Sequence, residues 1–260
     1  MTGFADSDLS EDAFLGGALK LLQPRRGYRA GVDPLLLAAA VPATRGQSVL
    51  ELGCGAGAAI LSLGSRVPGL SLTGVEVQDP YADLARRNAA RNGLEIEVHT
   101  ADLAALPRPL KARSFDHVIA NPPYFRAGAH LPADDAGRAM ALGDTAPLPL
   151  WIEVAARRLK PRGYLHLINR TDRLPEMLAV GTAHLGSIEA LPLSARLGRA
   201  PELVILRMRK DGRAPFRLHA PVILHDGDRH VQDGADDYRP EIAAVLREGA
   251  ALLWPSQPFT

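Results

Sequence analysis

The chain has 260 residues, of which 47% are hydrophobic, enough to bury the core of one large α/β domain. Thirty basic residues against 29 acidic ones give a net charge of +1, so the total charge indicates no polyanionic partner, and only a local basic patch could bind one. The single cysteine, Cys54, excludes a disulfide framework and a cysteine-built zinc site, which favours a reducing compartment such as the cytoplasm.

No apolar stretch approaches the length that spans a bilayer, so we expect no membrane partner. The start, MTGFADSDLSEDAF, carries acids where a signal peptide needs basic residues and an apolar core. We expect the first dozen residues to form a loose acidic tail, within an amino-terminal extension over residues 1–30.

From residue 48 onward, strand-like and helix-like segments alternate. Helices are expected after the first two strands, the second opened by Asp79 with Pro80 at its first position, and again over residues 147–160. This alternation predicts a mostly parallel sheet with helices on both faces, in a domain over residues 31–214 that ends with an antiparallel hairpin. The seven predicted strands span residues 48–52, 70–77, 95–100, 115–120, 163–169, 187–195 and 203–210.

Residues 215–260 are expected to form a carboxyl-terminal extension packed on the same domain. Within it, residues 216–225 could add a strand, and the acidic residues that follow predict a loop. His225, Asp228 and His230 are of metal-ligand types, but no second cluster completes a site, so we expect no metal.

Parallel α/β sheets bind ligands at the carboxyl ends of their strands. The first strand ends in Glu51-Leu-Gly53-Cys-Gly55-Ala-Gly57, where three glycines let the backbone turn tightly and approach a ligand. A nucleoside or a carboxylate could then lie against the following helix N-terminus. The spacing differs from GxGxxG, which disfavours a nicotinamide cofactor.

Acidic residues lie at the end of the second strand and just after the third. Glu76 lies 19 residues after Gly57, where a carboxylate can accept both hydrogen bonds of a ribose diol, and Asp102 could reach an adenine amino group. Val77 and Leu103, which lie beside these acids, are expected to contact the same ligand. Each acid alone would more often be structural, but their order at successive strand ends indicates one nucleoside site.

These residues resemble those of the class I S-adenosylmethionine (SAM)-dependent methyltransferases. The resemblance implies a Rossmann-like fold in which residues 51–57 pass the methionine end of SAM, Glu76 binds the ribose and Asp102 meets the adenine.

The fourth strand ends in ANPPYF, residues 120–125. The lone pair of an exocyclic amine is delocalised, so an enzyme that methylates it must make the nitrogen nucleophilic. The Asn121 side chain and the Pro122 carbonyl offer two acceptors for the two amine hydrogens, in a segment stiffened by Pro123. Tyr124 can stack on a planar substrate and Phe125 can border the pocket. The structural alternative is a turn in which the prolines only end the strand.

Asn-Pro-Pro-Tyr resembles the fourth motif of amino methyltransferases, which act on adenine N6, cytosine N4 or glutamine N5. With the segment around Asp33 and the carboxyl-terminal extension, residues 15–245 resemble the bacterial tRNA adenine-N6 methyltransferases, which modify the adenosine beside the anticodon of a valine tRNA. The resemblance implies that the Asp33 segment folds over SAM and that a basic surface holds tRNA. The alternative for residues 21–41 is a loop and an amphipathic helix capped by Asp33.

Two other functions stay open: a protein glutamine-N5 methyltransferase acting on release factors, and a non-catalytic protein that binds SAM or RNA. Clustered arginines favour RNA, although such clusters are also common as solvated faces. The loop after the motif is acidic, which leaves the identity of the RNA open, as is the choice between a monomer and a homodimer. The arginines expected to bind substrate are Arg25, Arg26, Arg29, Arg196 and Arg199.

Overall fold

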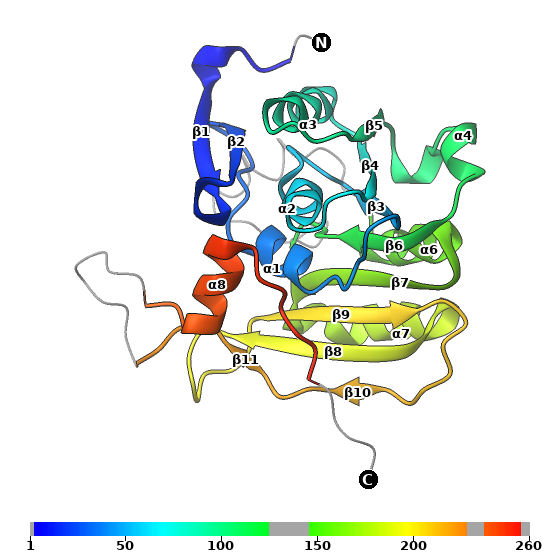
Figure 1. The fold of residues 1–260 in the computed structure, drawn as a ribbon. Coiled ribbons are helices and arrows are strands. Elements are labelled where there is room, and N and C mark those ends of the chain that lie inside the picture. The colour runs from blue at the N-terminus through cyan, green and yellow to red at the C-terminus, as the bar shows by residue number, and fades with distance from the viewer. Residues whose placement is uncertain (1–2, 125–145, 228–236, 256–260) are drawn as a thin grey trace.

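The structure is a computed structural model that describes residues 3–124, 146–227 and 237–255. Within these residues a nine-stranded sheet has the order β10-β8-β9-β7-β6-β3-β4-β5, with β11 also paired to β8, and a separate hairpin joins β1 to β2 (Figure 1). The strands are β1 (Leu9–Phe14), β2 (Leu19–Pro24), β3 (Ser48–Leu52), β4 (Ser71–Glu76), β5 (Glu97–Thr100), β6 (Phe115–Ala120), β7 (Leu159–Arg170), β8 (Gly186–Ser194), β9 (Leu203–Arg209), β10 (Arg217–Leu218) and β11 (Val222–Ile223).

The large sheet confirms the predicted fold. Strands β3 to β7 are parallel, and β9 runs antiparallel between β7 and β8 as the closing hairpin. The central strands β3 and β6 are buried along most of their length, which accounts for their mostly apolar residues. The extra strand expected at residues 216–225 is two short strands, β10 and β11, both parallel to β8.

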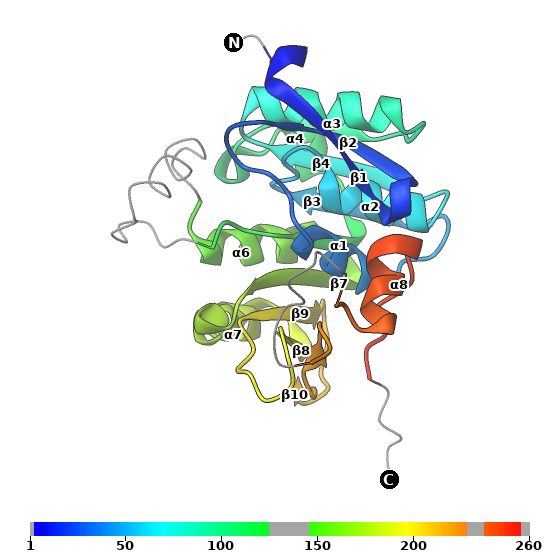
Figure 2. The ribbon, with the colours of Figure 1, turned by 90° about the vertical axis from the view of Figure 1, so that its left-hand side faces the viewer.

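Helices cover both faces of the sheet (Figures 1 and 2). The apolar clusters place α1, α2 and α8 on one face and α6 and α7 on the other. Helix α3 begins as predicted, at Asp79 with Pro80 in its first turn. The helices are α1 (Asp33–Ala39), α2 (Ala58–Arg66), α3 (Asp79–Arg91), α4 (Arg108–Lys111), α6 (Leu148–Arg158), α7 (Leu174–His184) and α8 (Pro240–Glu248), with 3₁₀ turns η1 (Asp6–Asp8), η2 (Leu15–Gly17), η3 (Leu103–Ala105) and η4 (Thr171–Arg173).

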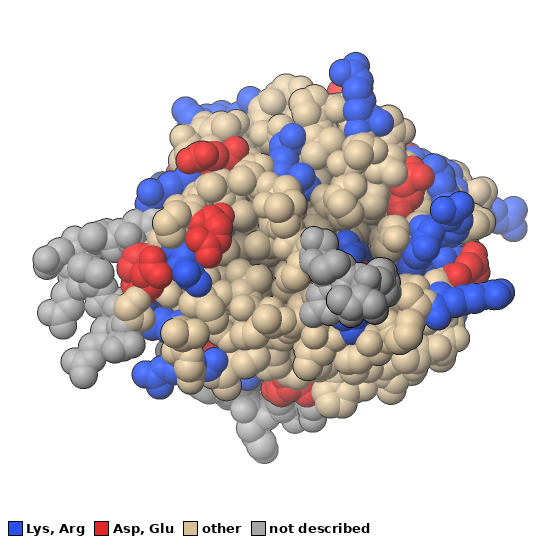
Figure 3. All heavy atoms as spheres, turned by 60° about the horizontal axis from the view of Figure 1, so that its bottom comes forward, with Lys and Arg blue, Asp and Glu red and all other residues tan. Residues whose placement is uncertain are grey.

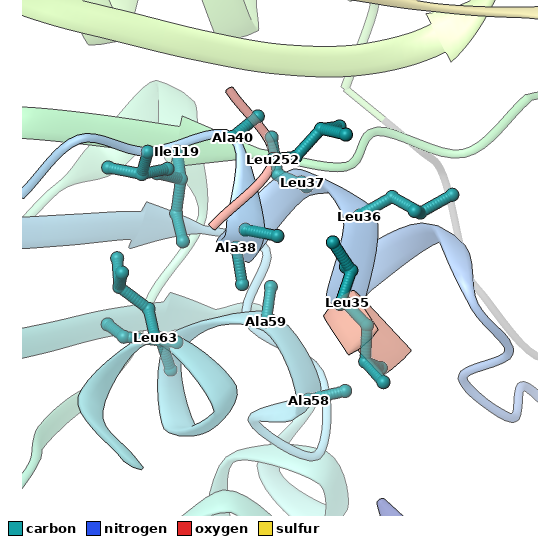
Figure 4. Packing of buried hydrophobic residues seen from close by; sticks show 14 of the residues in the cluster. Leu35, Leu36, Leu37, Ala38, Ala40, Ala58, Ala59, Leu63, Ile119 and Leu252 are labelled. Carbon is teal, nitrogen blue, oxygen red and sulfur yellow. The ribbon is translucent and has the colours of Figure 1, made fainter. Parts of the chain in front are cut away.

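Helix α1 is the centre of one apolar cluster (Figure 4). Its Leu36 and Leu37 are fully buried, and Ala59 and Leu63 of α2 belong to the same cluster. Leu252 closes the cluster from the carboxyl-terminal side, where its backbone N–H donates to the α1 carbonyl of residue 39 over 2.9 Å. This packing fixes the first turn of α1, which carries Asp33, beside the glycine loop.

The expectation of a loose acidic tail is wrong. The first dozen residues include η1 and most of β1, which pairs antiparallel with β2. Acids of β1 form ion pairs, Asp12 with Arg29 at 2.6 Å and Glu11 with Arg91 of α3. The sequence showed only the charges, because one of the two cations lies 80 residues away along the chain.

Candidate active site

A pocket of about 250 Å³ opens where β3, β4 and β6 end. This is the edge of a parallel sheet at which ligands bind. The pocket joins the glycine loop, the acids after β4 and β5, the segment after β6 and the start of α1. The predicted residues that line it are Arg29, Asp33, Gly53, Gly55, Glu76, Val77, Asp102, Leu103, Asn121, Pro122, Pro123 and Tyr124.

The first two glycines of the loop serve different purposes. Gly53 has φ of 63°, and a β-carbon there would lie only 2.4 Å from the Trp151 ring. Gly55 has φ of 53°, but a β-carbon there would meet no described atom within 4 Å. Gly53 therefore lets Trp151 pack against the backbone, whereas Gly55 leaves room in the pocket wall.

Glu51 and Gly57 do not line the pocket. The Glu51 side chain is buried, and its Oε2 accepts a hydrogen bond of 3.0 Å from the backbone N–H of Ile60 in the first turn of α2. Burial raises the pKa of Glu51 well above its usual range, and the nearby Glu76 raises it further. The contacts of Glu51 thus hold α2 to the end of β3 rather than reach a ligand.

Glu76, the last residue of β4, lines the pocket. Its Oε2 accepts from the N–H of Gly55, and its Oε1 accepts from the N–H of Gln78, each over 2.9 Å. Burial raises the pKa of Glu76, while these backbone hydrogen bonds lower it. Each carboxylate oxygen has a second lone pair, so both ribose hydroxyls could still be bound.

The pocket offers an apolar surface between the acids. Val77 is 56% exposed, although it is a large aliphatic residue. Asp102 also lines the pocket at an exposed position, and its Oδ1 accepts a hydrogen bond of 2.8 Å from the N–H of Ala104. An apolar surface flanked by carboxylates fits a nucleoside, whose flat base is apolar on its faces and polar at its edge.

The Asn-Pro-Pro-Tyr segment forms the wall opposite the acids. Among the described residues, the Asn121 side-chain amide has no hydrogen-bond partner, so it is free to bond a ligand. Tyr124 donates from its hydroxyl to Oδ2 of Asp33 over 2.5 Å. Burial raises the pKa of Tyr124, and the Asp33 charge raises it further, so the tyrosine stays protonated as the donor.

Asp33 therefore does not cap its own helix. Asp33 is the first residue of helix α1, and the N-cap position before it is occupied by Val32. Instead it ties the start of α1 to the segment after β6, 91 residues further along the chain.

Three aromatic residues of the pocket were missed from the sequence: Tyr28, Tyr81 and Trp151. The Tyr81 hydroxyl accepts from the N–H of Tyr28 over 2.9 Å and donates to its carbonyl over 3.1 Å. Burial raises the pKa of Tyr28, and the Asp33 charge adds to this. Single aromatic residues in a loop and a helix carry no local signal of a shared site.

The predicted arginines lie in different surroundings. Arg25, Arg26 and Arg199 are exposed, and Arg29 lines the pocket while its guanidinium bonds Asp12. Arg196 is only 6% exposed: it donates to Asp237 and to backbone carbonyls after β11. Its guanidinium is not available to a phosphate, and the expectation that Arg196 binds substrate is corrected accordingly.

Phe125 and the acidic loop that follows it, to residue 145, lie outside the described residues. Within the described part of the chain, no group of side chains is arranged to hold a metal ion. None of the helices described there is long and apolar enough to cross a membrane.

The fold and the pocket together define a class I SAM-dependent methyltransferase. The family model of the methyltransferase small domain matches residues 31–185, and the chain belongs to this family. A tRNA1(Val) (adenine(37)-N6)-methyltransferase of Porphyromonas gingivalis is 34% identical over 200 residues, covering 73% of this chain and 75% of that protein.

Solved structures agree with this assignment. A predicted O-methyltransferase from Agrobacterium tumefaciens has a TM-score of 0.68 and 27% identity, covering 85% of this chain and 98% of that one. A 16S rRNA guanine-N2 methyltransferase from T. thermophilus, solved with AdoMet and guanosine, has a TM-score of 0.57 and 22% identity, covering 78% and 50%. At that identity the second structure supports the fold alone.

Proposed function

We propose that this protein transfers a methyl group from SAM to the N6 amine of an adenine in tRNA, the adenosine at position 37 beside the anticodon of a valine tRNA. The observation that carries the proposal is the placement of Asn121 and Pro122 in the same pocket as Glu76 and Asp102. The name of the relative from Porphyromonas gingivalis supports the choice of adenine N6 in tRNA.

The residues suit the cofactor. Glu76 would hold the ribose hydroxyls, Asp102 the adenine amino group and Val77 the adenine face, while the open space beside Gly55 would admit the methionine end. When bound, SAM supplies an electrophilic methyl group on its sulfonium.

The amine is prepared by two acceptors. The Asn121 side-chain carbonyl and the Pro122 backbone carbonyl would accept the two hydrogens of adenine N6. These bonds draw the nitrogen toward a tetrahedral form, so its lone pair leaves the ring π system and becomes nucleophilic. The proton can leave to water after transfer, so positioning supplies much of the rate and no general base is required.

Tyr124 would stack on the flipped adenine, with its hydroxyl anchored on Asp33. The exposed Arg25, Arg26 and Arg199 would contact phosphates of the tRNA. Figure 3 shows basic side chains on both sides of the face brought forward there, with acidic side chains among them. A mixed surface of this kind favours a folded RNA of defined shape over binding to any polyanion.

The test is transfer of labelled methyl from SAM to unmodified total tRNA, followed by nucleoside analysis, with release factor protein assayed in parallel. The expected result is label in N6-methyladenosine. This label should be lost when position 37 of a valine tRNA transcript is changed to guanosine. Label in protein glutamine would overturn the substrate and keep the amine chemistry. Binding of SAM without transfer to RNA or protein would support a non-catalytic role.

A further inference from the structure

Asn169, near the end of β7, is fully buried and does not line the pocket. Its Nδ2 donates a hydrogen bond of 3.3 Å to the backbone carbonyl of Pro122. Its Oδ1 accepts a hydrogen bond of 2.9 Å from the N–H of Arg170. The second bond fixes which end of the amide is the donor, so the N–H group faces Pro122.

The register of the sheet explains why this side chain is needed. Residues 120 and 167 are the last paired positions of the parallel strands β6 and β7, which lie side by side in Figure 1. Two residues further, Pro122 faces Asn169. Pro122 and Pro123 have no N–H, so they donate no backbone hydrogen bond to hold the chain in place. The buried side-chain amide of Asn169 instead supplies a hydrogen bond between the two segments beyond their last paired residues.

We propose that Asn169 is a positioning residue for methyl transfer, which fixes the Pro122 carbonyl so that its second lone pair points at the substrate amine. This role rests on the proposed function, since it assigns the Pro122 carbonyl to the amine. A carbonyl oxygen accepts two hydrogen bonds, so the bond from Asn169 does not compete with that from the amine. It orients the peptide group between residues 122 and 123.

A purely structural role is the alternative, because a buried asparagine can also stabilise the end of a strand. The two roles differ in what a substitution changes. Loss of a structural bond lowers the melting temperature and reduces activity only through the fraction folded. Loss of positioning lowers kcat in protein that is folded and binds SAM normally.

The variants are Asn169→Leu, which keeps the approximate shape without a donor, and Asn169→Asp, which places carboxylate oxygens against the carbonyl. Asn92→Asp is the matched control, since it makes the same chemical change in an amide that bonds backbone groups of β2 and α3. Each protein is assayed for melting temperature, Kd for SAM, and kcat and KM on tRNA. Both Asn169 variants should lower kcat by about ten- to a hundredfold, with Kd for SAM within about twofold of wild type.

The Asn169→Asp variant adds a pH test. A protonated carboxyl donates an O–H to the Pro122 carbonyl, whereas the carboxylate repels it, and burial brings the titration of such a group toward neutral pH. The kcat of Asn169→Asp relative to wild type should therefore rise as pH falls from about 8 to about 5. Asn169→Leu and Asn92→Asp should show no such rise.

A wild-type kcat in folded Asn169→Leu, or a pH-independent ratio for Asn169→Asp, would overturn the positioning role while wild-type methylation of tRNA still supports the proposed function. If the wild-type protein itself forms no N6-methyladenosine, the proposed function fails and this role for Asn169 fails with it.

Discussion

Alanine at Gly53 and alanine at Gly55 should impair the protein in different ways, although one residue separates the two positions. Both glycines have positive φ, which costs an alanine about 1–2 kcal/mol. At Gly53 the new β-carbon would also lie 2.4 Å and 2.7 Å from ring carbons of Trp151, which is buried. Overpacking of this kind costs about 1–3 kcal/mol more. The free energy of unfolding should thus fall by about 2–5 kcal/mol in Gly53→Ala and about 1–2 kcal/mol in Gly55→Ala.

For a domain of this size, each kcal/mol lowers the Tm by about 2–4 °C, so thermal unfolding without SAM separates the two variants. The new β-carbon at Gly55 enters open space in the pocket wall. Gly55→Ala should therefore raise the Kd for SAM by about tenfold or more, about 1.4 kcal/mol, measured by calorimetric titration. The reasoning is refuted if Gly53→Ala is no less stable than Gly55→Ala, or if Gly55→Ala binds SAM as wild type does.

Asn121→Ala should leave the Kd for SAM near wild type and lower kcat on tRNA by about 10²-fold or more, because one of two amine acceptors is lost; equal losses in both would contradict the role. Burial raises the pKa of Glu51, so folding takes up a proton and wild-type stability falls as pH rises above about 4.3. The Tm of Glu51→Gln should accordingly rise relative to wild type between about pH 4 and pH 8, and a constant difference would count against this. Arg196→Ala should lower the Tm because Asp237 loses its buried ion-pair partner, whereas Arg199→Ala should keep the Tm and raise the Kd for tRNA by up to about fivefold. The reverse pattern in thermal unfolding and tRNA binding would refute the reassignment of Arg196.

The parts of the site that the sequence predicted are those with a local signal. Gly53, Gly55, Glu76 and Asn121 each lie at the end of a buried strand or within three residues after it, and the parallel order of β3, β4 and β6 brings them to one edge. The periodicity of the sequence and the predicted strand ends were sufficient to place these residues at the pocket, because each strand contributes the loop that follows it. Glu51 shares the local pattern, and its burial behind α2 depends on packing that the pattern does not show.

The parts that the sequence missed depend on contacts between distant residues. Arg196 was expected to contact RNA because it belongs to a cluster of seven basic residues between positions 196 and 217, yet its partner Asp237 comes 41 residues later. The first dozen residues were expected to form a loose tail because they carry several acids, and their cationic partners lie further along the chain. Neither pairing has a signature in the sequence, because any arginine can satisfy an acid once the fold brings them together.

The two halves of the pocket are held in place by different interactions. The cofactor half is built from backbone turns and a carboxylate bonded to backbone N–H groups, so it is part of the sheet itself. The amine half has two prolines that donate no hydrogen bonds, and side chains from elsewhere hold it: Asp33 through Tyr124, and Asn169 through Pro122. Under the proposed function, substitutions at Asn169 in β7, which does not line the pocket, should therefore change methyl transfer while leaving SAM binding intact. In the proposed reaction the four-residue segment would supply the acceptors, and residues outside the segment would fix the direction in which these acceptors point.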